Sequence, residues 1–345
     1  MKRSVTIKDV ARETKLAVST ISKYMNGGNI REENRALIEK VIQRLGYQPN
    51  NAARGLRSAK TYTVGLLLDY TGSQFSSKMA AHIEYELRKR GYSLILTGHL
   101  DDPEKAEEAA RFLVNEQVDG CIVVTLAGGE QFLKPFKEAG IPLLLLDRVI
   151  AGEEANYDSV MANGASGIYD VIEYLIRKGH KKIAMITGLD RDNTGIVAAR
   201  DRLRGYERAF EDYAIEINKN YIMGGDFSYQ SGYTEMHRLW RQDEKPTALC
   251  TANYDMGLGA MVAINELNIK IPEELSFVMF DDFEFSCLNR PRITAVRQPI
   301  EEIAEQAAVI LTRRMNGDWT GYPQQLRIHT DMQIRESVKD LNIME

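Results

Sequence analysis

The sequence predicts a multidomain protein: an all-α unit at the N-terminus, followed by an α/β core of two doubly wound parallel-sheet lobes. Two observations support this prediction. Apolar residues follow helical spacing through about the first sixty positions, and after Tyr62 short apolar runs alternate with amphipathic segments. Short apolar runs between helices are typical of parallel strands that are buried on both faces. With 345 residues, the chain is long enough for two or three units with separate cores.

The first sixty residues divide into three short helices. Thr6 and Asp9 have the spacing of a capping box at the start of the first helix. The second helix is predicted from about Ala17 to Met25, and the third from Glu32 to Leu45. Gly46 follows as the residue that ends the third helix.

Two short helices with a tight connection have the form of a helix-turn-helix, whose second helix enters the major groove of DNA. The first residues of that helix would be Val18, Ser19 and Thr20, with Ser22 and Lys23 one turn further on. Serine and lysine can hydrogen-bond base edges or phosphates, and valine can contact a thymine methyl group. Many helical hairpins look alike, so this pattern alone is weak evidence.

Charge is distributed unevenly along the chain. Residues 1–60 contain 13 lysines and arginines against five acidic residues, whereas the remainder contains 31 basic and 44 acidic residues. A positive head on an acidic body is the electrostatic pattern of a protein that binds a polyanion. A solvated basic face without a partner is the alternative.

The α/β part is predicted as two series of strands and helices. The predicted strands are 64–68, 93–97, 120–124 and 142–146 in the first series, and 182–186, 248–251, 276–280 and 295–296 in the second. The helices between them are predicted near 75–90, 103–116, 130–139, 163–178, 197–213, 229–240, 254–267 and 300–315. Two such series imply two lobes, and a ligand cleft is expected at the carboxyl ends of the strands.

Composition excludes several classes of protein. No apolar run approaches the roughly 18 residues needed to span a bilayer, and the first residues lack the apolar stretch of a signal peptide. Cys121, Cys250 and Cys287 lie far apart, which argues against a disulfide framework and fits the reducing cytoplasm. The five histidines are scattered, so no metal site and no cofactor is expected. No catalytic motif is found, and we expect no enzyme.

A longer set of motifs carries a family resemblance. The strings are Thr6–Ala11, Ser19–Lys23, Asn26–Gly27, Leu45–Asn50 and Ala53–Ser58. In order and spacing they closely resemble the lactose/galactose repressor (LacI/GalR) family, and the resemblance continues nearly to the end of the chain. The resemblance implies a helix-turn-helix headpiece and a core like that of periplasmic sugar-binding proteins. It also implies that the protein is a DNA-binding transcription regulator. Repression that is relieved by a sugar is the family's commonest mode.

The resemblance also implies domain boundaries. They are 1–48 for the helix-turn-helix domain, 49–61 for a hinge helix and linker, and 62–345 for the effector-binding core. Within the core, the N-lobe would comprise about 62–160 and 292–322, and the C-lobe about 161–291 and 323–340.

The hinge is expected to fold on DNA. Pro49 restricts the residue before it, and one short turn from Asn50 to Ser58 nucleates poorly alone. In the family, the hinge leucine, here Leu56, wedges into the minor groove and kinks the operator; packing on the dimer mate is the alternative. Besides the recognition helix, the DNA contacts implied by the resemblance are Thr6, Lys8, Asn26, Asn50, Ala53, Arg54 and Leu56.

Three positions of the headpiece depart from the family pattern. Lys15 stands where a glycine is usual in the turn, and Ala17 and Arg31 stand where serine usually caps the second and third helices. A lost serine cap typically costs about 1 kcal/mol. The sequence therefore predicts a headpiece that is less stable than those of its relatives and depends more on DNA.

Seven residues match effector contacts of the family. They are Tyr70, Phe75, Asp147, Arg202, Phe227, Asn253 and Asp281. A planar guanidinium suits paired oxygens, and carboxylate and amide groups bind hydroxyls. The alternatives are ion pairs or caps for the aspartates, a surface salt-bridge network for Arg202, and core packing for Phe227. The loop from Asp69 to Phe75 departs from the family's usual sequence, which weakens the transfer of any particular sugar.

The implied mechanism is a homodimer that binds a pseudo-palindromic operator in the bacterial nucleoid. A sugar in the cleft would change the spacing of the hinge helices and so the affinity for DNA, with corepression by a purine or a phosphorylated carrier protein as the alternative. No membrane partner is expected. Two other classes of protein remain: a sugar-transport component, and a sugar-modifying enzyme with a DNA-binding head.

Overall fold

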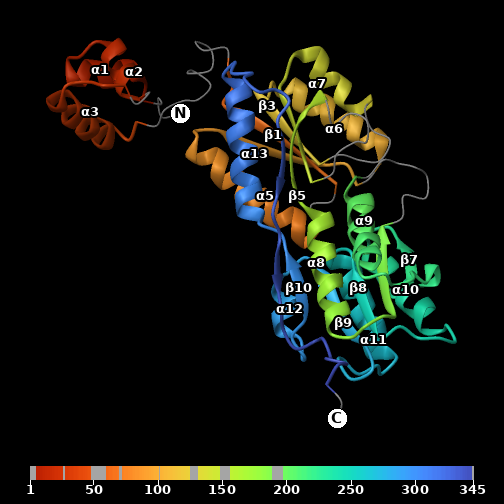
Figure 1. Ribbon diagram of the computed structural model, residues 1–345. Helices are drawn as coiled ribbons and strands as arrows, with labels where there is room; N and C mark the ends of the chain where they lie inside the picture. Colours follow the sequence, from red (N-terminus) through yellow and green to blue (C-terminus); the bar gives the residue numbers. More distant parts are fainter. Residues whose placement is uncertain are drawn as a thin grey trace. The chain divides into compact units, whose positions relative to one another are not determined.

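Figure 1 shows the chain as a computed structural model. The structure describes residues 5–25, 28–47, 60–69, 72–100, 102–124, 131–147, 156–188 and 197–343. The chain forms two compact units, Met1–Tyr62 and Thr63–Glu345.

The first unit is a three-helix headpiece. Its helices are α1 (Ile7–Thr14), α2 (Val18–Met25) and α3 (Glu32–Leu45), as the apolar spacing predicts. They enclose a small core of their own, with Val10, Ala11, Ile21, Ile38 and Val41 buried at its centre. This core fixes which face of α2 points inward, and so which residues α2 presents to solvent.

The ends of the headpiece helices include two of the three departures from the family pattern, Lys15 and Arg31. The Asp9 carboxylate accepts hydrogen bonds from the Thr6 backbone N–H at 2.9 Å and from the Thr6 hydroxyl at 2.7 Å, so the first helix is capped. Lys15, in contrast, adopts a left-handed conformation with φ of 53°, which favours glycine. Arg31 precedes α3 without a side-chain cap.

The first lobe of the core is built on a six-stranded sheet with the order β11-β5-β4-β3-β1-β2. Its strands are β1 (Thr63–Leu68), β2 (Ser93–Gly98), β3 (Gly120–Val123), β4 (Leu143–Leu146), β5 (Asp158–Ala162) and β11 (Gln325–Ile328), all paired in parallel. Helices α5 (Gln74–Lys89) and α13 (Ile300–Met315) pack together on one face of the sheet, while α6 (Pro103–Asn115), the short η1 (Gln131–Leu133) and α7 (Lys134–Ala139) cover the other. Because both faces are covered, the strands are apolar along most of their length.

The second lobe repeats this architecture (Figure 1). Its sheet has the order β12-β10-β9-β8-β6-β7, with β6 (Ile183–Gly188), β7 (Ile222–Gly225), β8 (Ala248–Thr251), β9 (Ser276–Phe280), β10 (Thr294–Arg297) and β12 (Asp331–Gln333). β12 is antiparallel to β10, and the other pairs are parallel. Helices α8 (Gly164–Arg177) and α9 (Val197–Asp212) pack as one pair, and α10 (Tyr229–Trp240) and α11 (Tyr254–Glu266) as another; η3 (Lys219–Tyr221) and α12 (Glu284–Leu288) are short.

The two doubly wound lobes confirm the predicted fold class, but the chain crosses between them later than predicted. β10 pairs with β9, so residues 294–297 belong to the second lobe rather than to the predicted N-lobe segment 292–322. β11 pairs with β5, so residues 325–328 belong to the first lobe rather than to the predicted C-lobe segment 323–340. The strand at 295–296 was predicted in the second series, so the N-lobe bound at 292 was set too early. The later crossing was missed because neither β5 nor β11 was recognised as a strand.

Candidate functional site

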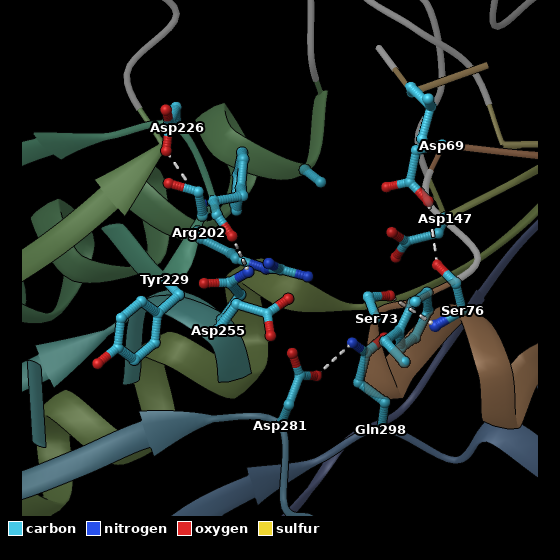
Figure 2. A pocket seen from close by; sticks show the side chains of 17 residues that line it. Asp69, Ser73, Ser76, Asp147, Arg202, Asp226, Tyr229, Asp255, Asp281 and Gln298 are labelled. Atoms are coloured by element: carbon cyan, nitrogen blue, oxygen red, sulfur yellow. Dashed lines mark hydrogen bonds between the residues drawn. The ribbon is translucent and has the colours of Figure 1, made fainter. Parts of the chain in front are cut away.

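A cavity of about 420 Å³ lies where the carboxyl ends of the strands of both lobes meet (Figure 2). From the first lobe it is lined by Asp69, Gly72, Ser73, Phe75, Ser76, Leu100 and Asp147, and from the second by Ala198, Arg202, Asp226, Phe227, Ser228, Tyr229, Asn253, Asp255, Asp281 and Gln298. Open α/β sheets place their ligand sites at this edge, because loops and helix N-termini converge there. The volume lies in the usual range for a small-molecule site.

Six of the seven sequence-predicted effector residues line this cavity: Phe75, Asp147, Arg202, Phe227, Asn253 and Asp281. They come from both lobes and are separated by up to two hundred positions in the chain. The seventh, Tyr70, lies outside the described residues. The geometry therefore brings the predicted set together, while the role of each residue stays a prediction.

Arg202 is held in one orientation beneath the cavity. Its side chain is 6% exposed, its Nη1 donates a hydrogen bond of 2.7 Å to the Ala252 carbonyl, and its guanidinium carbon lies 4.2 Å from the centre of the Phe280 ring. Nε is buried without a partner among the described residues. A buried donor that is not hydrogen-bonded costs about 1–3 kcal/mol, so this N–H is suited to meet an oxygen of a bound ligand. The predicted alternative, a surface salt-bridge network around Arg202, does not fit this burial.

Asp281 follows directly after β9 and is buried. Its Oδ1 accepts a hydrogen bond of 2.6 Å from Gln298 Nε2, and its Oδ2 accepts one of 3.2 Å from the backbone N–H of Tyr254. Burial raises the pKa of this carboxyl to about 6, against the opposing effects of the Arg202 charge and the Gln298 hydrogen bond. The carboxylate is therefore ionised at neutral pH.

Asn253 and Phe227 form one unit. The Asn253 side chain caps α11 by accepting from the Met256 N–H at 3.0 Å, and its Nδ2 donates to the Phe227 carbonyl at 2.8 Å. The Phe227 ring packs directly over Gly188 at the end of β6, where a Cβ atom would lie 2.2 Å from Phe227 Cε2. The ring position thus depends on a glycine beneath it.

Backbone strain gathers around the cavity. Leu100, Asp147, Phe227 and Asp281 all have positive φ angles, between 53° and 79°. Aspartate tolerates this conformation, but leucine and phenylalanine rarely adopt it. Strained residues of this kind cluster at ligand sites, where the surrounding structure holds them in place.

Sequence reasoning missed several lining residues. Asp69 comes directly after the apolar run of β1, as Asp147 does after β4 and Asp281 after β9, so the sequence carried a signal for Asp69. Asp226 follows the two glycines that end β7, and Gln298 follows Arg297 at the end of β10, so neither comes directly after an apolar run. Asp255 lies in the first turn of α11 and carried no comparable signal.

The headpiece presents the predicted DNA-contacting residues to solvent. On α2, Val18, Ser19 and Lys23 are exposed and Thr20 and Ser22 are half-buried, while Ile21 packs into the core. Thr6 and Lys8 at the start of α1 are also exposed. The remaining predicted contacts, Asn26, Asn50, Ala53, Arg54 and Leu56, lie outside the described residues, as does nearly all of the predicted hinge.

Comparisons with known proteins agree with this architecture. Residues 6–50 match the family described as bacterial regulatory proteins, lacI family, and residues 172–338 match the periplasmic binding protein-like domain. Catabolite control protein A of Priestia megaterium is 31% identical over 314 residues, which cover 91% of this chain and 93% of that protein. The HTH-type transcriptional repressor PurR of Haemophilus influenzae (strain PittEE) is 31% identical over 340 residues, 97% of this chain and 99% of that protein. Among solved structures, the cellobiose complex of the transcriptional regulator CelR is similar with a TM-score of 0.74 and 27% identity, covering 96% of this chain and 99% of that chain.

A helical DNA-binding headpiece joined to two lobes that enclose a ligand cavity defines a ligand-responsive transcription regulator. The chain belongs to the lacI family of bacterial regulatory proteins. Members of this family are not enzymes; they bind operator DNA as dimers and bind small-molecule effectors.

Within the described residues, no helix has the length and apolar character needed to cross a membrane. The same residues contain no group of three or more histidine, cysteine or acidic side chains arranged to hold a metal ion.

Proposed function

We propose that the chain is a transcriptional repressor whose affinity for its operator is controlled by a sugar bound in the cavity between the lobes. The observation that carries this proposal is the convergence of Arg202, Asn253 and Asp281 on one cavity of about 420 Å³ beside the Phe227 ring. Hydroxyl groups need donors and acceptors close together, and the face of a sugar ring packs on an aromatic ring. CelR, a similar regulator, is known in complex with cellobiose.

The cavity is placed so that a ligand affects both lobes. Asp69 and Asp147 lie on one side of it and Asp226 and Asp255 on the other, in separate lobes (Figure 2). Gln298, which bonds Asp281, lies between β10 of the second lobe and α13 of the first, where the chain crosses over. A ligand that contacts both sides stabilises one relative orientation of the lobes. A coupling free energy of only about 1–3 kcal/mol between the ligand site and the DNA site is enough to change DNA affinity strongly.

The DNA-binding role of α2 completes the proposal. Its exposed Val18, Ser19 and Lys23 would meet base edges and phosphates in the major groove. In a homodimer, two such helices would occupy the half-sites of a pseudo-palindromic operator, with Leu56 of each hinge in the minor groove between them.

Dimerisation itself has support in the first lobe. β2 is an edge strand of its sheet, and the apolar side chains of Leu96 on β2 and Phe112 on α6 are exposed. Apolar groups beside an unpaired sheet edge favour coverage by another chain. Light scattering of the purified protein gives its mass in solution and tests this step.

The effector test uses the full-length protein and an operator selected from random DNA. Thermal unfolding is followed with neutral sugars, sugar phosphates and purines, and DNA affinity is measured by fluorescence anisotropy with each ligand that raises the unfolding temperature. Arg202→Met should abolish the response to the ligand and retain binding to DNA. Arg204→Met is the matched control, because Arg204 lies on the same helix but is exposed, and it should behave like the wild type.

Other results would assign a different function. A response to a purine alone would replace the sugar by a nucleobase and favour corepression, as would tighter DNA binding with the ligand. Turnover of the bound ligand would identify an enzyme instead. DNA affinity should also fall steeply as salt rises, because phosphate contacts release counterions, and affinity that is independent of salt would contradict the DNA-binding role.

A further inference from the structure

The cavity between the lobes is strongly acidic. Its described lining contains five carboxylates, Asp69, Asp147, Asp226, Asp255 and Asp281, against one cationic side chain, Arg202. The formal charge of these groups is therefore −4 when all the carboxylates are ionised. A cavity with low-dielectric walls concentrates such a field, so it attracts cations and repels anions.

The single arginine does not offset this charge. Its guanidinium lies over the Phe280 ring and bonds the Ala252 carbonyl, and its charge lowers the pKa of the buried Asp281. Arg202 and Asp281 therefore compensate each other in the floor of the cavity. The remaining four carboxylates also line the cavity, and within the protein Asp69 accepts a hydrogen bond of 3.0 Å from the Ser76 hydroxyl and Asp226 one of 3.0 Å from the Ser228 N–H.

Two of these carboxylates oppose each other across the lobes. Asp69 follows β1 of the first lobe, whereas Asp255 lies in the first turn of α11 in the second. Both carboxylates line the cavity, from opposite lobes (Figure 2). Burial raises the pKa of Asp255, and the charge of Asp69 adds to this increase because like charges disfavour ionisation. Within the described part of the chain, Asp255 has neither an ion pair nor a side-chain hydrogen bond.

The cavity also contains a buried acceptor that requires a donor. Gln298 is 6% exposed; its Nε2 is bonded to Asp281, but its Oε1 has no partner among the described residues. The five carboxylates and this Oε1 are acceptors, whereas Arg202 is the one cationic donor among the described lining residues. A complementary ligand must bring several N–H or O–H groups.

From this charge and this excess of acceptors we infer that the effector is an amine-bearing sugar, with its ammonium group placed between Asp69 and Asp255. An ammonium group supplies three donors and a positive charge at one point. Between the two carboxylates it would replace repulsion across the cleft by attraction to both lobes, and so favour the closed cavity. The inference deepens the proposed function and rests on it.

The same charges exclude anionic effectors. A sugar phosphate would bring about two negative charges into a cavity whose described lining holds one arginine against five carboxylates. The hydroxyl groups of a neutral sugar could hydrogen-bond Arg202 and Gln298, but they would leave the repulsion between the Asp69 and Asp255 carboxylates in place. Discrimination between an amine and its neutral parent should therefore reside in these two aspartates.

The test compares ligands that differ in a single group. Calorimetric titrations of the full-length protein near neutral pH use glucose, galactose and mannose, their 2-amino-2-deoxy derivatives, the N-acetylated forms of these amines, and the 6-phosphates. We expect at least one amino sugar to bind about tenfold or more tightly than both its neutral parent and its N-acetyl form, with no binding of the phosphates. The preference should shrink as salt rises.

Isosteric variants locate the ammonium group. Asp255→Asn and Asp69→Asn should each reduce the affinity for the amino sugar about tenfold and leave that for the neutral parent within about twofold, since only the charge is removed. Asp243→Asn, an exposed position between α10 and β8, is the matched control and should change neither affinity.

The outcomes separate this inference from the proposed function. Neutral sugars that bind as tightly as their amines would refute the inference and leave the sugar-responsive repressor intact. Preferential binding of a phosphate would refute the inference in the same way. If none of these saccharides binds, the proposed sugar effector fails and the inference fails with it.

Discussion

Gln298 Nε2 donates a hydrogen bond of 2.6 Å to Asp281 Oδ1, and both side chains are buried beneath the cavity. Asp281 follows β9, and Gln298 follows β10 where the chain passes from the second lobe to α13 of the first. This cavity-lining carboxylate is therefore bonded to the crossover between the lobes. In the proposed mechanism, this bond would transmit ligand contact to the orientation of the lobes.

The first prediction concerns Asp281 and pH. Burial raises the pKa of this carboxyl from the ordinary 3.8 to about 6, so the folded protein holds the proton more tightly than the unfolded chain. The contribution of this group to stability is thus fully present below about pH 4 and is lost as pH rises through about 6. Asp281→Asn should remove a penalty of at most about 3 kcal/mol at neutral pH.

Unfolding temperatures across this pH range check the prediction. We expect Asp281→Asn to unfold at a higher temperature than the wild type near neutral pH, with the difference shrinking as the solution is acidified, and to lose the ligand response. Asp243→Asn should show no such pH dependence. A variant that is less stable than the wild type at neutral pH would contradict the assigned shift.

The second prediction concerns the glycine beneath the Phe227 ring. A Cβ atom at Gly188 would lie 2.2 Å from Phe227 Cε2, so Gly188→Ala must displace the ring from the cavity wall. We expect ligand affinity to fall about tenfold while the headpiece still binds DNA. The double variant Gly188→Ala with Phe227→Leu removes the ring atoms that clash. Its loss of stability should therefore be smaller than the sum of the losses in the two single variants, and close to the loss in Phe227→Leu alone. Strictly additive losses would show that the ring and the glycine are independent.

The elements that the sequence predicted best are those with an uninterrupted local signal. α3 begins at Glu32 and ends at Leu45 as predicted, because its apolar spacing and the following Gly46 are both local. β8 and β9 also have their predicted bounds, since each is a continuous apolar run. Asp147 and Asp281 line the cavity for a similar reason, since each directly follows such a strand. Phe75 and Arg202, in contrast, lie on helices α5 and α9.

The elements that were missed depend on partners far away in the chain. β5 opens on Asp158, a charged residue that would argue against a buried strand, and its burial is explained by Arg314, 156 positions further on. β11 mixes polar and apolar residues and is recognisable as a strand only through its pairing with β5. Without these two strands, the points where the chain changes lobes could not be placed.

The third prediction concerns that ion pair. Arg314 and Asp158 are 1% and 0% exposed, with Nε 2.7 Å from Oδ2 and Nη2 3.1 Å from Oδ1. Arg314→Leu would leave a buried carboxylate without its partner, which costs about 3–5 kcal/mol. Chemical denaturation of the core should show this loss. Arg111→Ala breaks the exposed pair with Glu107 and serves as the control, expected to cost less than about 1 kcal/mol. Equal losses in the two variants would mean that burial does not determine how much the ion pair of Arg314 and Asp158 contributes to the free energy of unfolding.

The last prediction concerns the stability of the headpiece. Lys15 adopts φ of 53°, and a side chain in this left-handed conformation costs about 1 kcal/mol relative to glycine. Arg31 begins α3 without a side-chain cap, and a serine cap typically contributes about 1 kcal/mol. Lys15→Gly and Arg31→Ser should therefore each raise the free energy of unfolding of a fragment that spans residues 1–62 by about 1 kcal/mol. The two effects should add, because the sites lie at different helices. Thermal unfolding of the fragment measures this, with Lys40→Ser on the exposed face of α3 as a control that should destabilise slightly. If neither substitution stabilises the fragment, the departures from the family pattern do not weaken this headpiece, and its dependence on DNA must have another origin.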